Sequence, residues 1–247
     1  MNYIVFDLEF NQSFDFKSGS SAKSNPECPF EIIQIGAVKL DTDFNYIGEF
    51  NYYIKPVIYK RIHPFVEKIT GINQKMLNEG MPFETVYDAF CEFVNPQTDI
   101  LCSWGGDDIK SLYRNIRFHK LPTSAMPDRY MNIQSYATHY LKYEPGRAIG
   151  LKNAVELLEI EIGDEFHNAL NDAAYTAEVF KIVKPEIMIA EKFKPSDIKM
   201  PKIKNKGINT KSMYKYFTKS LERELTTEEK AIIKTAYKFG RNNTYDV

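Results

Sequence analysis

The sequence predicts an α/β protein with one mixed sheet, in which an antiparallel three-strand meander continues into parallel strands and is flanked by helices. Two observations support this prediction. Three apolar segments rich in β-branched and aromatic residues precede every helical pattern, and strands that follow one another along the chain commonly pair antiparallel. Beyond them, helical patterns alternate with short apolar runs, an order typical of helices packed on a sheet that contains parallel strands.

The first predicted strand covers residues 1–10 and carries two acids, Asp7 and Glu9. Alternate residues of a strand point to the same face, so both carboxylates leave the sheet together. Two adjacent negative charges on a core strand repel each other and lose hydration unless a positive charge lies between them. We therefore expect a metal ion here; the alternative is a strand end at which both acids reach water.

The second and third predicted strands cover residues 31–40 and 44–56, with a turn at 41–43 between them. The long connection at 11–30 contains five serines and two prolines, a composition that indicates a mobile loop. Because this loop begins just after Glu9, we expect it to lie over whatever the acids bind.

Helical patterns begin at residue 63 and are separated by short buried strands at 99–104 and 131–133. The clearest helix is the last, because its apolar residues recur at helical spacing. In chain order the predicted helices cover 63–69, a turn capped by Asn73, 82–94, a segment that begins near 105–108, 150–158 and 169–183.

The C-terminal part differs from the rest in charge. Residues 1–189 contain 18 Lys and Arg against 26 Asp and Glu, whereas residues 190–247 contain 14 against 7. We therefore divide the chain into a domain of residues 1–189 and a basic extension of residues 190–247. The extension is expected to hold a linker at 192–209 and helices at 210–224 and 228–239. A basic tail on an acidic body favours a polyanionic partner, although lysine-rich helices that face water give the same count.

Composition excludes several classes of protein. No run of 18 or more apolar residues exists, so no membrane span and no membrane partner are expected. The first residues lack the basic and apolar regions of a signal peptide. Three cysteines without metal-binding spacing suit a reducing compartment, and we expect the protein in the cytoplasm.

Four acids and one histidine from three distant segments have the residue types of a site for hard divalent cations: Asp7, Glu9, Asp108, His167 and Asp172. Mg²⁺ prefers oxygen ligands and keeps several waters, so few carboxylates can hold it. Two such ions about 3.5–4 Å apart can hold the attacking and leaving oxygens of a phosphoryl displacement. We expect Asp7 to bridge them beside Glu9 and Asp172, with Asp108 acting through water or at the second ion.

The spacing of His167 and Asp172 constrains the backbone between them. Five residues of a regular helix rotate the side chain by about 140°, so the two cannot share a face if both are helical. We therefore expect Asn168 to cap the helix, Asp172 to lie near its first turn and His167 to precede it. Imidazole changes charge near neutral pH, so His167 could take a proton from the attacking water. The alternative, an ordinary hydrogen-bonded histidine, is our interpretation of the other three: His63, His119 and His139.

These segments, in this order, resemble the DEDDh branch of the DnaQ-like 3′-to-5′ exonucleases. Phe6-Asp7-Leu8-Glu9 is similar to the first motif, and residues 167–172 have the His-x-Ala-x-x-Asp spacing that distinguishes the branch. The resemblance covers roughly residues 1–183. Ser103-Trp104-Gly105 before Asp108 is closest to the Eri-type and KapD-like members, which trim RNA.

Two departures from the family pattern affect the site. Asp107 and Asp108 are adjacent, so either could be the second-motif ligand; we choose Asp108 because Leu112 then follows it by four residues on the core face. The serine-rich loop at 11–30 is unusually long, which leaves the size of the mouth of the site open.

The resemblance implies a ribonuclease H-like sheet that holds two Mg²⁺ or Mn²⁺ ions. It also implies that the protein releases 5′-mononucleotides from the 3′ end of a single-stranded nucleic acid, with RNA favoured over DNA. It implies that Leu8 and Phe10 flank the terminal nucleotide. Trp104 could stack on a base, a contact that tolerates any sequence, or could belong to the core.

Two alternatives to an RNA exonuclease stay open. One is a DNA-directed, proofreading-type 3′-to-5′ exonuclease, because no residue visible in the sequence identifies a contact with the 2′-hydroxyl of RNA. The other is a nucleic-acid-binding module that keeps the fold and has little turnover. The complete set of acids together with His167 argues against this second alternative.

Overall fold

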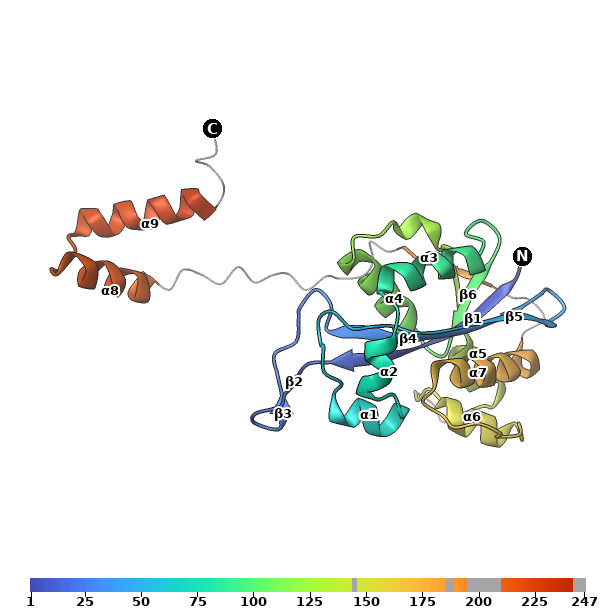
Figure 1. Ribbon diagram of the computed structural model, residues 1–247. Coiled ribbons are helices and arrows are strands. Elements are labelled where there is room, and N and C mark those ends of the chain that lie inside the picture. The colour runs from blue at the N-terminus through green and yellow to red at the C-terminus, as the bar shows by residue number, and fades with distance from the viewer. Residues whose placement is uncertain (144–145, 185–188, 195–209, 242–247) are drawn as a thin grey trace. The chain divides into compact units, whose positions relative to one another are not determined.

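The computed structural model describes residues 1–143, 146–184, 189–194 and 210–241. The chain divides into two compact units, Met1–Pro201 and Lys202–Val247. The larger unit is built on a six-stranded mixed sheet in the order β5-β4-β1-β6-β7-β8 (Figure 1). The predicted fold class is confirmed, because an antiparallel meander of β1, β4 and β5 continues into the parallel strands β6 and β7.

The central strand of this sheet is β1, which pairs antiparallel with β4 on one side and parallel with β6 on the other. At the far edge, a short strand absent from the sequence prediction, β8, pairs antiparallel with β7. The strands of the sheet, in chain order, are β1 (Tyr3–Gln12), β4 (Phe30–Leu40), β5 (Tyr46–Tyr53), β6 (Ile100–Ser103), β7 (Arg129–Asn132) and β8 (Glu191–Lys192).

Helices cover both faces of the sheet (Figure 1). Ile4, Phe6 and Leu8 of β1 face one hydrophobic core, to which α3 (Phe83–Phe93) and α4 (Asp107–Phe118) contribute. Tyr3 and Val5 face the other core, which is shared with α5, α6 and α7. These three helices are α5 (Ile133–Tyr140), α6 (Leu151–Leu157) and α7 (Ala169–Val183). Because side chains alternate along β1, Asp7 and Glu9 belong to the face that α7 covers.

A third, smaller core forms under two short helices, α1 (Pro64–Thr70) and α2 (Gln74–Glu79), which pack on Ile33 of β4. Local capping sets their ends. Asn73 accepts a hydrogen bond from the backbone of Met76, and Gly71 ends α1 at a φ of 69°, a left-handed conformation that favours glycine. A single turn of 3₁₀ helix, η1 (Thr123–Ala125), lies between α4 and β7.

The segment that was predicted as a loop after Glu9 is partly ordered into strands. β1 continues to Gln12, and β2 (Phe14–Asp15) pairs antiparallel with β3 (Ser20–Ser21). In this extension of β1, Asn11 and Gln12 pair with β4, and the Asn11 side chain donates to the carbonyls of Tyr59 and Arg61. A composition rich in serine does not reveal such a contact.

The helix α5 was also missed. It begins at Ile133, directly after the last residue of β7, and the side chain of Asn132 caps it by accepting from the backbone of Ser135. With no loop between strand and helix, the apolar run at 131–133 indicates only the strand.

The smaller unit contains α8 (Thr210–Leu221) and α9 (Thr227–Arg241). Thr226 and Glu229 form a capping box: the Thr226 hydroxyl accepts from the Glu229 backbone, and the Glu229 carboxylate accepts from the Thr226 backbone. Most of the predicted linker, residues 195–209, lies outside the described residues. No helix in the described part of the chain is both long enough and apolar enough to cross a bilayer.

Candidate active site

The register between β1 and β4 places the first two acids opposite two residues that contact α7. Asp7 lies opposite Gly36, and Glu9 lies opposite Gln34. Paired residues of neighbouring strands point to the same face, so all four side-chain positions lie on the α7 face of the sheet. The acids therefore lie beside the point at which α7 begins.

Gly36 is required for that close approach. A Cβ atom at this position would lie 2.1 Å from the backbone nitrogen of Leu170 and 2.2 Å from the carbonyl carbon of Ala169. No side chain fits between atoms at such distances, so the backbone of α7 contacts the bare backbone of β4.

Gln34, which is fully buried, fixes the start of α7 by hydrogen bonds. Its Nε2 donates to the side-chain oxygens of Asn51 at 2.9 Å and Asn168 at 3.2 Å, and its Oε1 accepts from the backbone of Ala169 at 3.2 Å. Gln34 was not among the residues predicted to belong to the site. The signal that could have revealed its role is a polar residue between two isoleucines in a buried strand, because a buried amide needs partners.

The start of α7 has the geometry that the His167–Asp172 spacing predicts. Asn168 is the N-cap, and its side chain accepts from the backbone of Leu170 at 3.1 Å. Asp172 lies in the first turn, and His167 precedes the helix with a φ of 66°. The backbone N–H of His167 donates to Oδ2 of Asp172 at 3.1 Å.

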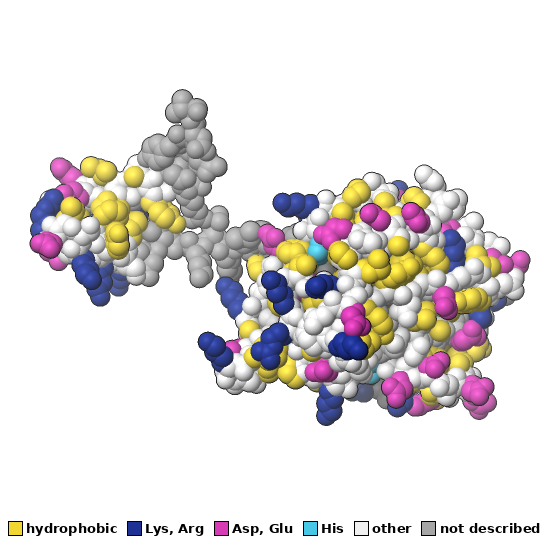
Figure 2. All heavy atoms as spheres, viewed as in Figure 1, with side chains coloured by type: hydrophobic (Ala, Val, Ile, Leu, Met, Phe, Trp, Pro, Cys, Tyr) yellow, Lys and Arg dark blue, Asp and Glu magenta, His cyan; other side chains and the backbone are white. Residues whose placement is uncertain are grey.

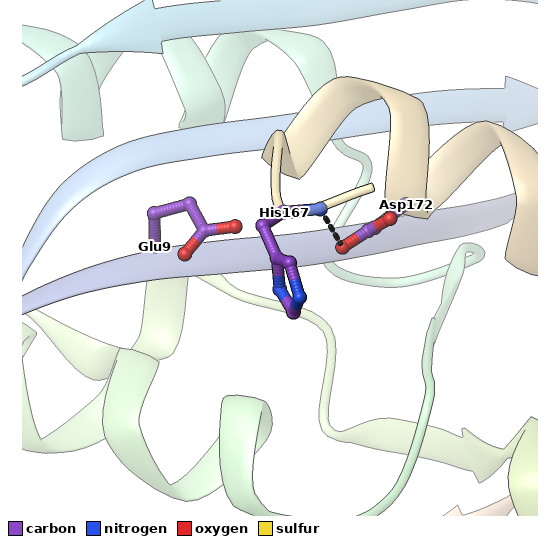
Figure 3. Close-up of side chains that lie close together, drawn as sticks. All are labelled: Glu9, His167 and Asp172. Atoms are coloured by element: carbon purple, nitrogen blue, oxygen red, sulfur yellow. Dashed lines mark hydrogen bonds between the residues drawn. The ribbon is translucent and has the colours of Figure 1, made fainter. Parts of the chain in front are cut away.

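Three side chains converge here, as Figure 3 shows: Glu9 from β1, Asp172 from α7 and His167 from the segment before α7. Each offers one ligand atom, and these atoms lie within 4.8 Å of one another. Glu9 and Asp172 are each 9% exposed, whereas His167 is exposed. Oδ1 of Asp172 is buried and has no hydrogen-bond partner. A buried carboxylate oxygen without a partner, in a set of oxygen and nitrogen donors, fits a divalent metal ion.

Asp7 and Asp108 are outside this three-residue cluster but are electrostatically part of the site. Burial raises the pKa of Asp7 well above its ordinary value, and the negative charges of Asp108, Asp172 and Glu9 raise it further. Burial, followed by the charges of Asp172 and Asp108, raises the pKa of Glu9 to about 8. Four carboxyl groups that oppose one another's ionisation would be stabilised by cations between them.

The two neighbouring aspartates at the start of α4 have different surroundings. The side chain of Asp107 is 98% exposed and pairs with Lys110 at 3.1 Å. Asp108 is half-buried, and burial together with the charge of Asp107 raises its pKa to about 7, with a smaller effect of Asp172. Electrostatic interaction with Asp7 and Asp172 therefore links Asp108 to the site.

The turn before α4 is held in place by β7. Gly105 adopts a φ of 90°, and its N–H donates to the side chain of Asn132 at 3.2 Å. Its carbonyl accepts from the hydroxyls of Ser103 and Tyr130. This turn connects β6 to the helix that carries Asp108, so β7 helps to position that acid.

The three residues predicted to contact the terminal nucleotide lie in different surroundings. Leu8 is 3% exposed and belongs to the core on the α3–α4 face. Phe10 is half-buried, with its ring 6.3 Å from that of Phe30. Trp104 is also half-buried, and its Nε1 donates to the carbonyl of Ile149 at 3.2 Å.

The sheet topology is ribonuclease H-like, and a match to an exonuclease family defines the class of the protein as a nuclease. The exonuclease family RNase_T matches residues 4–180, and the chain belongs to this family. The observed sheet and the order of the motifs agree with the DEDDh resemblance found in the sequence.

Two curated relatives differ in how much of their length this chain covers. "Probable 3′-5′ exonuclease KapD" of Bacillus subtilis (strain 168) is 27% identical over 201 residues, which span 79% of this chain and 90% of that protein. "ERI1 exoribonuclease 2" of Mus musculus is 26% identical over 197 residues, which span 70% of this chain and 27% of that protein. The chain therefore spans most of the bacterial relative and about a quarter of the mouse one.

A solved structure shares the fold. The nuclease domain of 3′hExo, described as a DEDDh family member bound to rAMP, superposes with a TM-score of 0.64 at 21% identity. The superposition covers 78% of this chain and 97% of that chain.

Proposed function

We propose that this protein hydrolyses phosphodiester bonds from the 3′ end of a single-stranded nucleic acid, with RNA favoured over DNA, and releases 5′-mononucleotides. The observation that carries the proposal is the convergence of Glu9, His167 and Asp172, with ligand atoms within 4.8 Å of one another, beside two further aspartates. Membership of the exonuclease family supports the reaction class.

The proposed metal ligands are Asp7, Glu9, Asp108 and Asp172, and the proposed cofactors are two Mg²⁺ or Mn²⁺ ions. Such ions supply positive charge that stabilises the attacking and leaving oxygens of a phosphoryl displacement. Their carboxylate ligands suit hard cations. The partnerless Oδ1 of Asp172 is the atom that most clearly needs such a cation.

His167 is the proposed general base. Its backbone N–H is hydrogen-bonded to Asp172, which holds the imidazole beside the carboxylates, and its side chain is exposed. An exposed imidazole at the edge of an acidic site can take a proton from an attacking water and pass it to solvent. The ring is also close enough to Glu9 and Asp172 to be a metal ligand. A variant without the ring separates the two roles, because it loses metal affinity only if the ring is a ligand.

The preference for RNA rests on relatives. The mouse relative is named an exoribonuclease, and the 3′hExo structure is bound to rAMP. Leu8, Phe10 and Trp104 are the proposed contacts of the terminal nucleotide; Phe10 and Trp104 are half-buried, and Leu8 is 3% exposed. The proposed location is the cytoplasm, where Cys28, Cys91 and Cys102, all free thiols, would stay reduced.

The test uses single-stranded RNA and DNA oligomers of matched sequence, each labelled at the 5′ or the 3′ end, with Mg²⁺, Mn²⁺ or a chelator. We expect 3′-labelled RNA to release labelled mononucleotide at once, 5′-labelled RNA to shorten stepwise, and both reactions to stop in chelator. DNA that is lost as fast as RNA would reject the RNA preference. Binding without cleavage would favour a nucleic-acid-binding module instead.

A further inference from the structure

Four aromatic rings from two separate segments form a continuous chain on the surface of the larger unit. The rings of Phe16 and Phe14 are 4.9 Å apart, those of Phe14 and His63 are 4.7 Å apart, and those of His63 and Phe65 are 6.5 Å apart, all edge to face. The end members are exposed, Phe16 by 38% and Phe65 by 58%. We call these four residues the aromatic chain.

The aromatic chain lies at the end of the strand that carries the acids. Asn11, two residues after Glu9, donates to the carbonyls of Tyr59 and Arg61 and accepts from the backbone of His63 at 2.9 Å. This contact brings the segment of His63 beside the end of β1. Phe14 follows Glu9 by five residues, which span at most about 18 Å when extended. A single strand whose 3′ end lies at Glu9 reaches the rings within a few nucleotides.

Positively charged residues are frequent in the two segments that carry the exposed rings. The guanidinium of Arg61 lies 3.8 Å from the centre of the Phe16 ring. Residues 14–24 and 60–68 contain five Lys and Arg against two acids, although residues 1–189 as a whole are acidic. In Figure 2 the Lys and Arg side chains of this unit are most numerous on the side where Figure 1 shows β2, β3 and α1.

We infer that the aromatic chain and its cations bind the part of a single-stranded nucleic acid that precedes the 3′ end. Bases would stack on Phe16 and Phe65, while Arg61 and the neighbouring lysines contact phosphates. Exposed rings beside cations are the features with which proteins bind single strands regardless of sequence. An apolar protein partner would be expected to prefer a patch with less charge. The inference rests on the proposed function, because that function places a 3′ end beside Glu9.

The test measures binding of fluorescent oligomers of twelve and three nucleotides by anisotropy, in chelator so that cleavage cannot interfere. In the double variant Phe16→Ala/Phe65→Ala we expect the Kd for the 12-mer to rise at least about tenfold, since one lost base–aromatic stack weakens binding by roughly five- to 150-fold. In the double variant, the Kd of the three-nucleotide oligomer divided by the Kd of the 12-mer should fall toward one. Phe16→Trp/Phe65→Trp should restore the wild-type ratio.

The matched control is Tyr46→Ala, which removes a ring that is 53% exposed. Tyr46 pairs with Leu40, which in turn pairs with Tyr3, so this ring lies at the opposite end of the sheet. It should leave the 12-mer Kd unchanged. Arg61→Ala, which keeps the rings, should reduce the salt dependence of 12-mer binding.

An unchanged 12-mer Kd in the double variant, or an equal loss in Tyr46→Ala, would overturn the inference. Cleavage of the three-nucleotide RNA with Mg²⁺ tests the active site separately. A protein that binds the 12-mer through Phe16 and Phe65 but cleaves no oligomer would reject the proposed function, and the aromatic chain would then be a surface for single strands without a defined 3′ end.

Discussion

The backbone N–H of His167 donates to Oδ2 of Asp172 at 3.1 Å, so the residue that belongs to the acidic cluster also holds the histidine in place. His167 has a φ of 66°, a conformation that non-glycine residues adopt uncommonly and that is found at functional sites. One oxygen of Asp172 therefore positions the proposed base, while the other, which is buried without a hydrogen-bond partner, is the proposed metal ligand. A change at Asp172 should affect both functions.

Replacement of His167 by Ala tests the role of the imidazole. We expect kcat to fall by about 10²- to 10⁴-fold, the usual contribution of a general base, while the Kd for RNA stays within a few fold. Mn²⁺ affinity, measured by titration calorimetry, should be retained if the ring is the base and not a ligand. His139→Ala, at an exposed histidine of α5, is the control. Wild-type turnover in His167→Ala would reject the assignment.

The adjacent aspartates of α4 provide a matched pair. Asp108→Asn removes a charge that interacts with Asp7, and we expect kcat/KM to fall by about 10²-fold or more, a loss comparable to that of one transition-state contact. Asp107→Asn removes an exposed charge paired with Lys110 and should leave activity within about threefold, since exposed ion pairs contribute little. The opposite ranking would make Asp107 the second-motif ligand.

The raised pKa values of the carboxyl groups predict how stability depends on pH without metal. The folded-state pKa of Glu9, about 8, and that of Asp108, about 7, exceed the ordinary values of about 4, so the folded protein keeps protons that the unfolded chain releases. The stabilisation is complete below about pH 4 and is lost as the pH rises through 7 and 8. In chelator, the melting temperature should therefore fall between pH 6 and pH 8.5.

Metal ions should reverse this trend, because they bind the ionised carboxylates. We expect Mg²⁺ or Mn²⁺ to raise the melting temperature more at pH 8.5 than at pH 6. The variant Asp7→Asn, which has one charge fewer, should lose less stability on going to pH 8.5 in chelator. A metal-induced shift that is equal at both pH values would contradict this account of the site.

Gly36 and Gly48 test the close approach of α7 to β4. A Cβ at Gly36 would lie 2.1 Å from the backbone of Leu170, so Gly36→Ala should displace the start of α7, lower the melting temperature strongly and abolish cleavage. A Cβ at Gly48 of the neighbouring strand would lie 3.5 Å from the Phe93 ring, an ordinary contact, so Gly48→Ala should stay close to wild type. Thermal unfolding of both variants would show equal stability if the approach were unimportant.

Deletion of the smaller unit, residues 202–247, tests the role of the basic extension. Because β8 and Phe193 pack on the larger unit, where Phe193 stacks on Tyr113 at 4.9 Å, a cut at residue 190 would remove part of the fold. Residues 202–247 contain eleven Lys and Arg against five acids. We expect their deletion to weaken RNA binding and to flatten its salt dependence. An unchanged slope of log Kd against log salt would show that these lysines do not contact phosphates.

The sheet and most helices could be predicted from the sequence because local patterns encode them. A continuous apolar run marks β4, alternation marks β5, and apolar spacing marks α3 and α7. The expected cap at Asn168 also followed from local chemistry, since its side chain accepts from a backbone two residues later. The short strands β2, β3 and β8 were missed, because each contains only two residues and depends on pairing with another strand.

By itself, the sequence determined which residues are candidates for the chemistry: a pair of acids two apart on a strand, and a histidine five residues before an aspartate with a cap between them. Only the tertiary structure decided how they meet. It exposes Asp107 while placing Asp108 where its charge affects Asp7. It anchors the start of α7 through Gln34 and Gly36. It also brings Phe14 into contact with His63, 49 positions later in the chain. Periodicity and capping act within one element, whereas burial, charge repulsion and close backbone contact depend on segments that are distant in sequence and adjacent in space.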